Sequence, residues 1–130
     1  MKKGNDTEKL QHILNAIGKI ESILLLTDLK TFMTSDEKHY SVCMLFTIIG
    51  EAAGKLSADL FSQYPNVSWR EMISMRNVLV HDYEDTDFKT VWDTAQNDLP
   101  VLKAQITNIL AELQPPRMTV QEGMKKNPKI

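Results

Sequence analysis

The sequence predicts an all-α fold, an up-and-down bundle of four long helices with one further short helical turn. Two observations carry this prediction. Apolar residues recur at steps of three and four along four segments, which is the spacing of one face of an α-helix. No segment alternates polar and apolar residues as a half-buried strand would.

Length and composition indicate one globular domain. The chain has 130 residues, of which 42% are hydrophobic and 25% are charged, so it can bury one core. A net charge of −2 argues against a protein that coats nucleic acid by bulk charge, but it permits a local basic cleft. The single cysteine, Cys43, lies among apolar residues and suggests a buried thiol in a reducing compartment. Because no signal peptide and no membrane-spanning run is visible, we expect a cytoplasmic protein.

The first long helix is expected to begin near Asp6 or Thr7, either of which can cap it, and to extend to Leu26. A short helical turn between Leu29 and Met33 follows it. The apolar stripe of the first helix consists of Leu10, Ile13, Leu14, Ile17, Ile20 and Leu24.

A second long helix is expected to begin at Ser35-Asp36 and to run straight to Leu60. His39 precedes its apolar stripe, so we expect this histidine to be solvated. Gly50 lies inside the helix, where glycine costs about 1 kcal/mol relative to alanine, and it therefore indicates the close approach of another helix. The stripe consists of Val42, Leu45, Ile49, Ala52, Leu56 and Leu60.

The last long helix is predicted to begin near Asp87 and to end at Leu113. Its stripe continues through Pro100, where the missing amide hydrogen should bend the helix without starting a new domain. Residues 1–113 are thus predicted to form the bundle. Residues 114–130 form a basic tail without apolar periodicity, which we expect to be extended or disordered until it binds something.

The third long helix carries the candidate site. Ser68 and Glu71 have the spacing of a capping box, which places the start of the helix at Trp69. The apolar steps of this helix lead to Arg76 and Tyr83, on the face that should turn toward other helices. A buried arginine requires a partner or a bound anion, so this face is predicted to be functional.

His81 follows Arg76 by five residues, which is about 140° around a regular helix. For both side chains to reach one substrate atom, the helix must end or distort near His81, or a second subunit must complete the site. The acidic run after His81 suits a helix end. His81 with Asp82, Asp85 and Asp87 fits no defined metal-ligand pattern, so we expect no metal and no other cofactor.

Arg76, Asn77, His81 and Tyr83 resemble the Arg-x4-His-x-Tyr motif of HEPN-domain ribonuclease toxins. The resemblance is to the HepT-like toxins, which pair with a minimal nucleotidyltransferase antitoxin, and it covers roughly residues 7–113. It implies a HEPN-like helical bundle. Further blocks in the same order support it: Ile49-Gly50-Glu51-Ala52, Trp69-Arg70, Val91-Trp92 and Gln96-Asn97-Asp98-Leu99-Pro100.

The resemblance implies the toxin of a type II- or type VII-like toxin–antitoxin pair, an endoribonuclease that cleaves RNA without a metal. Arginine is permanently cationic and its planar fork matches phosphate oxygens, whereas histidine moves protons near neutral pH. Arg76 and His81 are therefore the candidate catalytic residues. Asn77 could bind phosphate or position His81. Glu51 either orients Arg76 through a charge-assisted pair or is merely solvated.

The resemblance also implies that the antitoxin adds AMP to Tyr83. This tyrosine follows the expected helix end, so we expect its hydroxyl to be accessible. An adenylyl group there would occupy the cleft and compete with RNA phosphate for Arg76. The alternative is a tyrosine that only packs or binds RNA.

The same residues are also compatible with a protein that is not an enzyme. Arg76 would be a structural arginine paired with Glu51, His81 would cap its helix, and Tyr83 would anchor the core. The protein would then be a helical module that binds a nucleotide or a partner in the same cleft. We also expect a symmetric homodimer, because one arginine–histidine pair is too small to grip several nucleotides.

Overall fold

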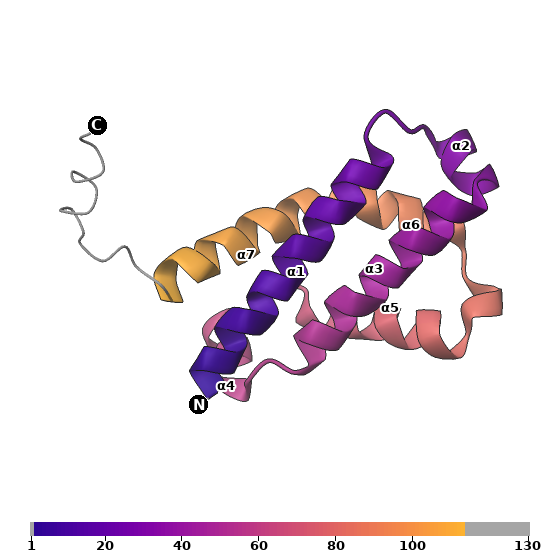
Figure 1. Cartoon of the computed structure of the whole chain (residues 1–130). Helices are drawn as coiled ribbons and strands as arrows, with labels where there is room; N and C mark the ends of the chain where they lie inside the picture. Colours follow the sequence, from indigo (N-terminus) through magenta and orange to yellow (C-terminus); the bar gives the residue numbers. More distant parts are fainter. Residues whose placement is uncertain (1, 114–130) are drawn as a thin grey trace, which may run out of the picture.

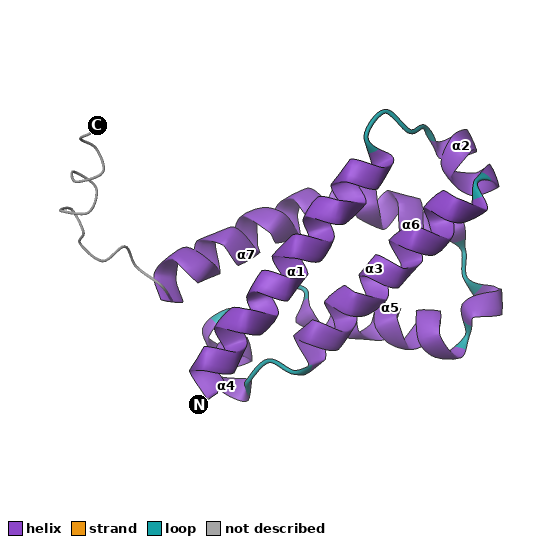
Figure 2. Cartoon of the chain, viewed as in Figure 1, coloured by secondary structure: helices purple, strands orange, loops and turns teal. Residues whose placement is uncertain are grey.

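The computed structural model describes residues 2–113, with side chains from residue 5 onward, and this part of the chain is helical without a strand (Figures 1 and 2). The predicted all-α bundle is confirmed. Its long helices are α1 (Lys2–Leu24), α3 (Asp36–Gly54), α5 (Trp69–His81) and α7 (Leu99–Leu113). The shorter ones are α2 (Leu29–Thr34), α4 (Ala58–Gln63) and α6 (Phe88–Asp93), with a 3-10 turn at Tyr83–Asp85 and a π turn at Thr94–Asp98. The tail predicted for residues 114–130 lies outside the described residues.

Helix α3 is the centre of the bundle, because it packs against α1 on one side and α5 on the other (Figure 1). Helix α7 packs against α1, and α6 contacts α2, which directly precedes the start of α3. The predicted apolar stripes form the core. Its fully buried large side chains come from α1, α2, α3, α4, α6 and α7: Leu10, Ile13, Ile17, Ile20, Phe32, Val42, Ile49, Leu60, Val91, Ile106 and Ile109.

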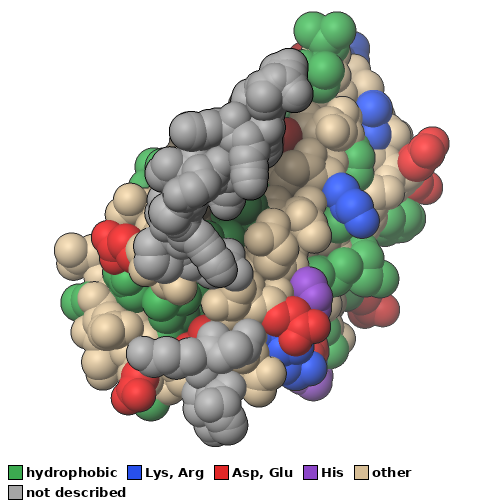
Figure 3. Space-filling model, turned by 60° about the vertical axis from the view of Figure 1, so that its left-hand side comes forward, with side chains coloured by type: hydrophobic (Ala, Val, Ile, Leu, Met, Phe, Trp, Pro, Cys, Tyr) green, Lys and Arg blue, Asp and Glu red, His purple; other side chains and the backbone are tan. Residues whose placement is uncertain are grey.

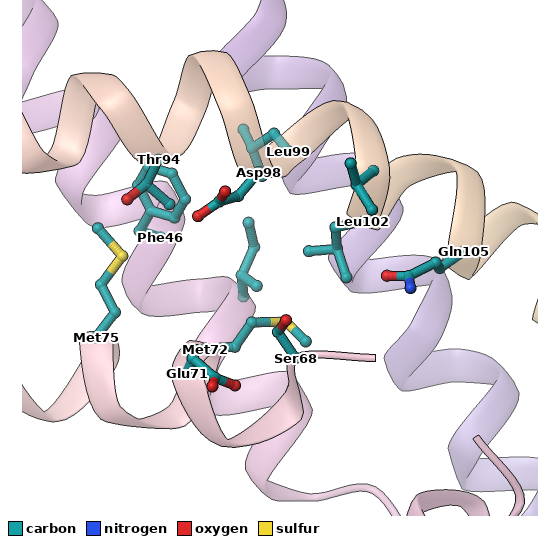
Figure 4. A pocket seen from close by; sticks show the side chains of 12 residues that line it. Phe46, Ser68, Glu71, Met72, Met75, Thr94, Asp98, Leu99, Leu102 and Gln105 are labelled. Carbon is teal, nitrogen blue, oxygen red and sulfur yellow. The ribbon is translucent and has the colours of Figure 1, made fainter. Parts of the chain in front are cut away.

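A cavity of about 220 Å³ separates α5 from the π turn and the start of α7 (Figure 4). Met72 and Met75 line it from α5, and Leu99 and Leu102 line it from α7. Glu71 and Asp98 lie at the same cavity on opposite sides. The motif helix is therefore packed tightly on its α3 side and loosely on its α7 side.

Three helix boundaries differ from the sequence prediction. α1 begins before Asp6, whose carboxylate does not cap it but is 2% exposed and bonded to the start of α4. α1 ends at Leu24, and Leu26 has a positive φ of 60° in the turn that follows. α3 ends at Gly54 and does not reach Leu60, because Ser57 caps a separate helix by accepting a hydrogen bond from the Leu60 amide at 3.2 Å.

Two further details refine the prediction. α5 begins at Trp69 as predicted, but the Ser68 side chain makes no capping hydrogen bond. Where the sequence predicted a bend near Pro100, the helix contains the π turn, in which the Leu99 amide donates to the carbonyl of Thr94. Proline has no amide hydrogen, so a carbonyl one turn before Pro100 loses its helical donor and the ladder shifts there. Cys43 is buried as expected, and burial raises the pKa of its thiol to about 11.

Candidate active site

Helix α5 is anchored at its first residue. The Trp69 side chain is buried, and its indole N–H donates to the carbonyl oxygen of Tyr64 at 2.8 Å. Its ring packs against Phe61 with a centroid distance of 5.6 Å. This anchor fixes the register of α5, and so determines which residues further along face α3.

The close crossing of α3 and α5 depends on Gly50. A Cβ atom at this position would lie 2.6 Å from the carbonyl oxygen of Met72, and closer still to the Cβ of Arg76. Both distances are below contact, so only glycine fits without moving a helix. The close approach predicted for Gly50 is confirmed, and its consequence is that Arg76 lies directly across from α3.

Arg76 is held by Glu51 in a half-buried ion pair. The Arg76 Nε and Nη2 donate to Oε2 of Glu51 at 3.0 and 2.5 Å, and the two side chains are 28% and 42% exposed. Arg76 Nη1 donates to Oδ1 of Asn77 at 3.0 Å. Within the described residues, two of the five N–H groups of the guanidinium are left without a protein acceptor. The arginine is thus fixed in place and still able to donate to an anion.

His81 is the exposed last residue of α5, and the helix ends there as predicted. The Asp82 amide closes the final turn by donating to the carbonyl of Val78 at 2.8 Å. The helix is regular up to His81, so about 140° separates the directions of Arg76 and His81. A single chain therefore brings Arg76, Glu51 and Asn77 together but leaves His81 on a different side of the helix.

Tyr83 lies in the 3-10 turn after α5. Its hydroxyl was expected to be accessible, but it is buried. The oxygen is buried and has no hydrogen-bond partner among the described residues. Its ring packs against Tyr40 at 5.8 Å and Phe88 at 6.0 Å between centroids. Burial, followed by the nearby Cys43, raises the pKa of this phenol to about 12. The expectation failed because the turn folds back onto α3 after the helix ends.

His39 is a neighbour of this turn that the sequence prediction placed in solvent. It is 4% exposed, and its ring lies 4.0 Å from that of Phe88 and 4.6 Å from that of Tyr40. Its Nε2 is 3.3 Å from Oδ1 of Asp36, whereas its Nδ1 has no partner in the described structure. The signal was present, because His39 lies one step of three before Val42 and so extends the buried stripe of α3.

Exposed apolar residues flank the Arg76–Glu51 pair. Tyr40, Met44 and Ile48 of α3 are 51%, 60% and 41% exposed, and their steps of four place them on the side of the helix that carries Glu51. Val80 follows Arg76 by one turn of α5 and is 45% exposed. An apolar surface beside a polar site is typical of an interface with another molecule.

On the face of the molecule shown in Figure 3, basic and acidic side chains are interspersed, and the described residues there form no extended basic surface. In the described part of the chain, no three His, Cys, Asp or Glu side chains are arranged to hold a metal ion. None of the described helices is long and apolar enough to cross a membrane.

Comparison with known proteins identifies the family of this chain. Residues 13–109 match the model of the family described as Ribonuclease HepT-like. The chain is 30% identical over 107 residues to a protein of Thermococcus cleftensis named probable ribonuclease HepT, covering 82% of this chain and 97% of that protein.

Two proteins of Methanocaldococcus jannaschii, provisionally named RNases, are 30% and 29% identical over 105 residues each. The alignments cover 81% of this chain and 90% and 87% of those proteins. No solved structure matches the chain. The family match and the coverage of its relatives confirm the resemblance seen in the motif, and the chain belongs to the HepT-like ribonuclease family.

Proposed function

We propose that this protein is the toxin of a toxin–antitoxin pair, an endoribonuclease that cleaves RNA without a metal through Arg76 and His81. The observation that carries the proposal is the state of Arg76, which Glu51 and Asn77 hold in place while two of its N–H groups are left for an anion. A family of ribonucleases supplies the substrate class.

In the proposed reaction the ribose 2′-hydroxyl attacks the adjacent phosphorus. A bond forms between O2′ and phosphorus, and the bond between phosphorus and O5′ breaks. His81 moves the protons: one leaves the 2′-hydroxyl and one reaches the departing O5′. Arg76 holds the phosphate oxygens, whose charge grows during the attack. The Oδ1 of Asn77 is occupied by Arg76, which leaves its amide N–H groups to bind the phosphate or to position His81.

Matched variants test the catalytic assignment. Arg76→Ala and His81→Ala should abolish RNA cleavage and growth inhibition, with helical content and melting temperature close to wild type. His12→Ala and Lys89→Ala are the controls, because they remove an exposed histidine of α1 and an exposed lysine paired with Asp93. If either site variant cleaves RNA at the wild-type rate, the assignment is wrong.

The site is proposed to be completed in a symmetric homodimer. Arg76 and His81 point to different sides of α5, and the exposed residues Tyr40, Met44 and Ile48 lie beside the pair. A two-fold axis along this surface would bury the apolar stripe and set two motifs across one cleft. Light scattering at micromolar concentration should give about twice the monomer mass. A monomer under those conditions would remove the two-chain site.

Control by an antitoxin is the third part of the proposal. A nucleotidyltransferase would transfer AMP to Tyr83: the phenol oxygen attacks the α-phosphorus of ATP, pyrophosphate leaves and the phenol proton is lost. Co-expression with the transferase and measurement of the intact mass test this. The wild type should gain AMP units and lose activity, and Tyr83→Phe should gain none. Silencing of the wild type without a mass change would mean inhibition by binding alone.

A further inference from the structure

Three buried polar atoms without partners gather around the turn that carries Tyr83. They are the Tyr83 hydroxyl, Oγ1 of Thr86 and Nδ1 of His39, and none is hydrogen-bonded within the described structure. Phe88 connects them, because its ring contacts those of His39 and Tyr83, and Thr86 lies two residues before it. The turn is therefore closed over α3 by ring packing and not by side-chain hydrogen bonds.

The closed turn is held by few interactions. Between its ends, the backbone hydrogen bonds run from the Asp85 amide to the Asp82 carbonyl at 2.9 Å and from the Thr86 amide to the Tyr83 carbonyl at 3.0 Å, whereas Asp82 closes the last turn of α5 and Asp87 caps α6. Ring contacts favour the closed position. Unpaired buried polar atoms oppose it, since each would regain hydrogen bonds in water. A segment with this balance can open without unfolding the helices on either side.

We propose that the Tyr83 turn, residues 82–87, is a latch whose opening limits modification of the tyrosine. The inference rests on the proposed transfer of AMP to Tyr83. Attack on a phosphorus atom requires the phenol oxygen to approach the nucleotide directly, and in the closed turn this oxygen is buried. The rate of transfer is then the rate for an open turn multiplied by the fraction of molecules that are open. A transferase must capture the open state, and loss of Phe88 packing must raise the rate.

The test measures the reactivity of the phenol without any transferase. Full-length protein is nitrated with tetranitromethane, and peptide mass mapping follows Tyr83 against free N-acetyltyrosinamide. Tyr83 should react at least tenfold more slowly than the free compound. Phe88→Ala and the milder Phe88→Leu should each raise its reactivity severalfold. Phe61→Ala is the matched control, because it removes an aromatic contact to Trp69 at the other end of α5.

The outcomes separate this inference from the proposed function. Nitration of Tyr83 at the free rate overturns the latch, whatever the transferase does. Protection that appears only at concentrations where the protein dimerises also overturns it, because the cover would then be the second chain. If Tyr83 is protected at all concentrations and released by Phe88→Leu, the latch holds. If the transferase then adds AMP to Phe88→Leu faster than to the wild type in the same proportion, the role of the latch in modification is supported. If neither protein gains AMP, the proposed modification is wrong, but the protection of Tyr83 by the closed turn is not contradicted.

Discussion

At the residue scale, one missing side chain determines where the arginine of the site can lie. Gly50 lets α5 approach α3 until the backbone of Met72 is within contact distance, and this places Arg76 opposite Glu51. The arginine is then positioned before any ligand arrives, so no free energy of binding is needed to order it.

Gly50→Ala is expected to cost about 1–3 kcal/mol of unfolding free energy, because a methyl group must force two helices apart. It should also lower RNA cleavage, since Arg76 moves with α5. Gly18→Ala is the control: nothing lies within 4 Å of a Cβ at that position in α1. That change should stabilise the protein by roughly 0.5–1 kcal/mol, as alanine does in a helix interior. Urea unfolding measures the unfolding free energy of both variants. Equal stability of the two would contradict the close crossing of α3 and α5 at Gly50.

The raised pKa of the Tyr83 phenol predicts that the protein loses stability at high pH. The pKa of its phenol is about 12 when folded, against an ordinary value near 10 when unfolded. Below pH 10 both states are protonated and the group has no effect. Between pH 10 and 12 the unfolded state ionises first, so the folded state loses up to about 1.4 kcal/mol per pH unit. The difference in unfolding free energy between pH 8 and pH 11 should be smaller in Tyr83→Phe, and an unchanged difference would show that the hydroxyl is solvated.

At the scale of the elements, periodicity located the long helices, but it missed both ends of α1 and the end of α3. The apolar stripes predicted α1, α3, α5 and α7, because burial of one face depends only on spacing along the helix. The boundary at Gly54 was missed because Leu56 and Leu60 continue the apolar series across a break. Ser57 caps α4 after the break, and its contact with Asp6, which is distant in sequence, holds it there; no apolar pattern reveals that contact.

The same limit applies to the candidate site. Arg76, Glu51 and Gly50 could be connected from the sequence, since a buried charge needs a partner and an interior glycine needs a reason. The burial of His39 could also have been predicted, because the apolar stripe of α3 extends to it, whereas the burial of the Tyr83 hydroxyl could not, because it depends on the path of the turn after α5. Composition suggested a solvated acidic turn, whereas the rings of Tyr40 and Phe88 draw it onto α3.

The link between α1 and α4 gives a prediction of its own. The Ser57 amide and hydroxyl donate to the two carboxylate oxygens of Asp6 at 2.8 and 2.6 Å, and Asp6 is 2% exposed. Asp6→Ala should cost roughly 2–3 kcal/mol, because two hydrogen bonds to a charged group are lost and a backbone N–H is left unpaired. Asp59→Ala, an exposed acid in the first turn of α4, should change the melting temperature far less. Similar effects of both changes would show that the contact is not stabilising.

At the scale of the whole molecule, the two-chain site predicts complementation. If Arg76 of one chain acts with His81 of the other, an equal mixture of Arg76→Ala and His81→Ala chains contains heterodimers with one intact pair. Random assortment makes about half of the dimers mixed, and each holds one of two sites, so about a quarter of wild-type activity should return. Neither variant alone should be active. No recovery after exchange, confirmed by mass spectrometry of differently tagged chains, would place the whole site within one chain.

In the proposed mechanism, Arg76 and His81 promote attack by the 2′-hydroxyl of RNA without a metal. The most direct measurement uses an RNA with one mapped cleavage position, in excess chelator, beside the same RNA with a single 2′-deoxy substitution there. We predict that the wild type cleaves the first RNA to a 5′-hydroxyl fragment and a 2′,3′-cyclic phosphate and does not cleave the second, and that His81→Ala cleaves neither. Cleavage of the deoxy substrate, 5′-phosphate products, or activity that appears only when divalent metal is restored would contradict it.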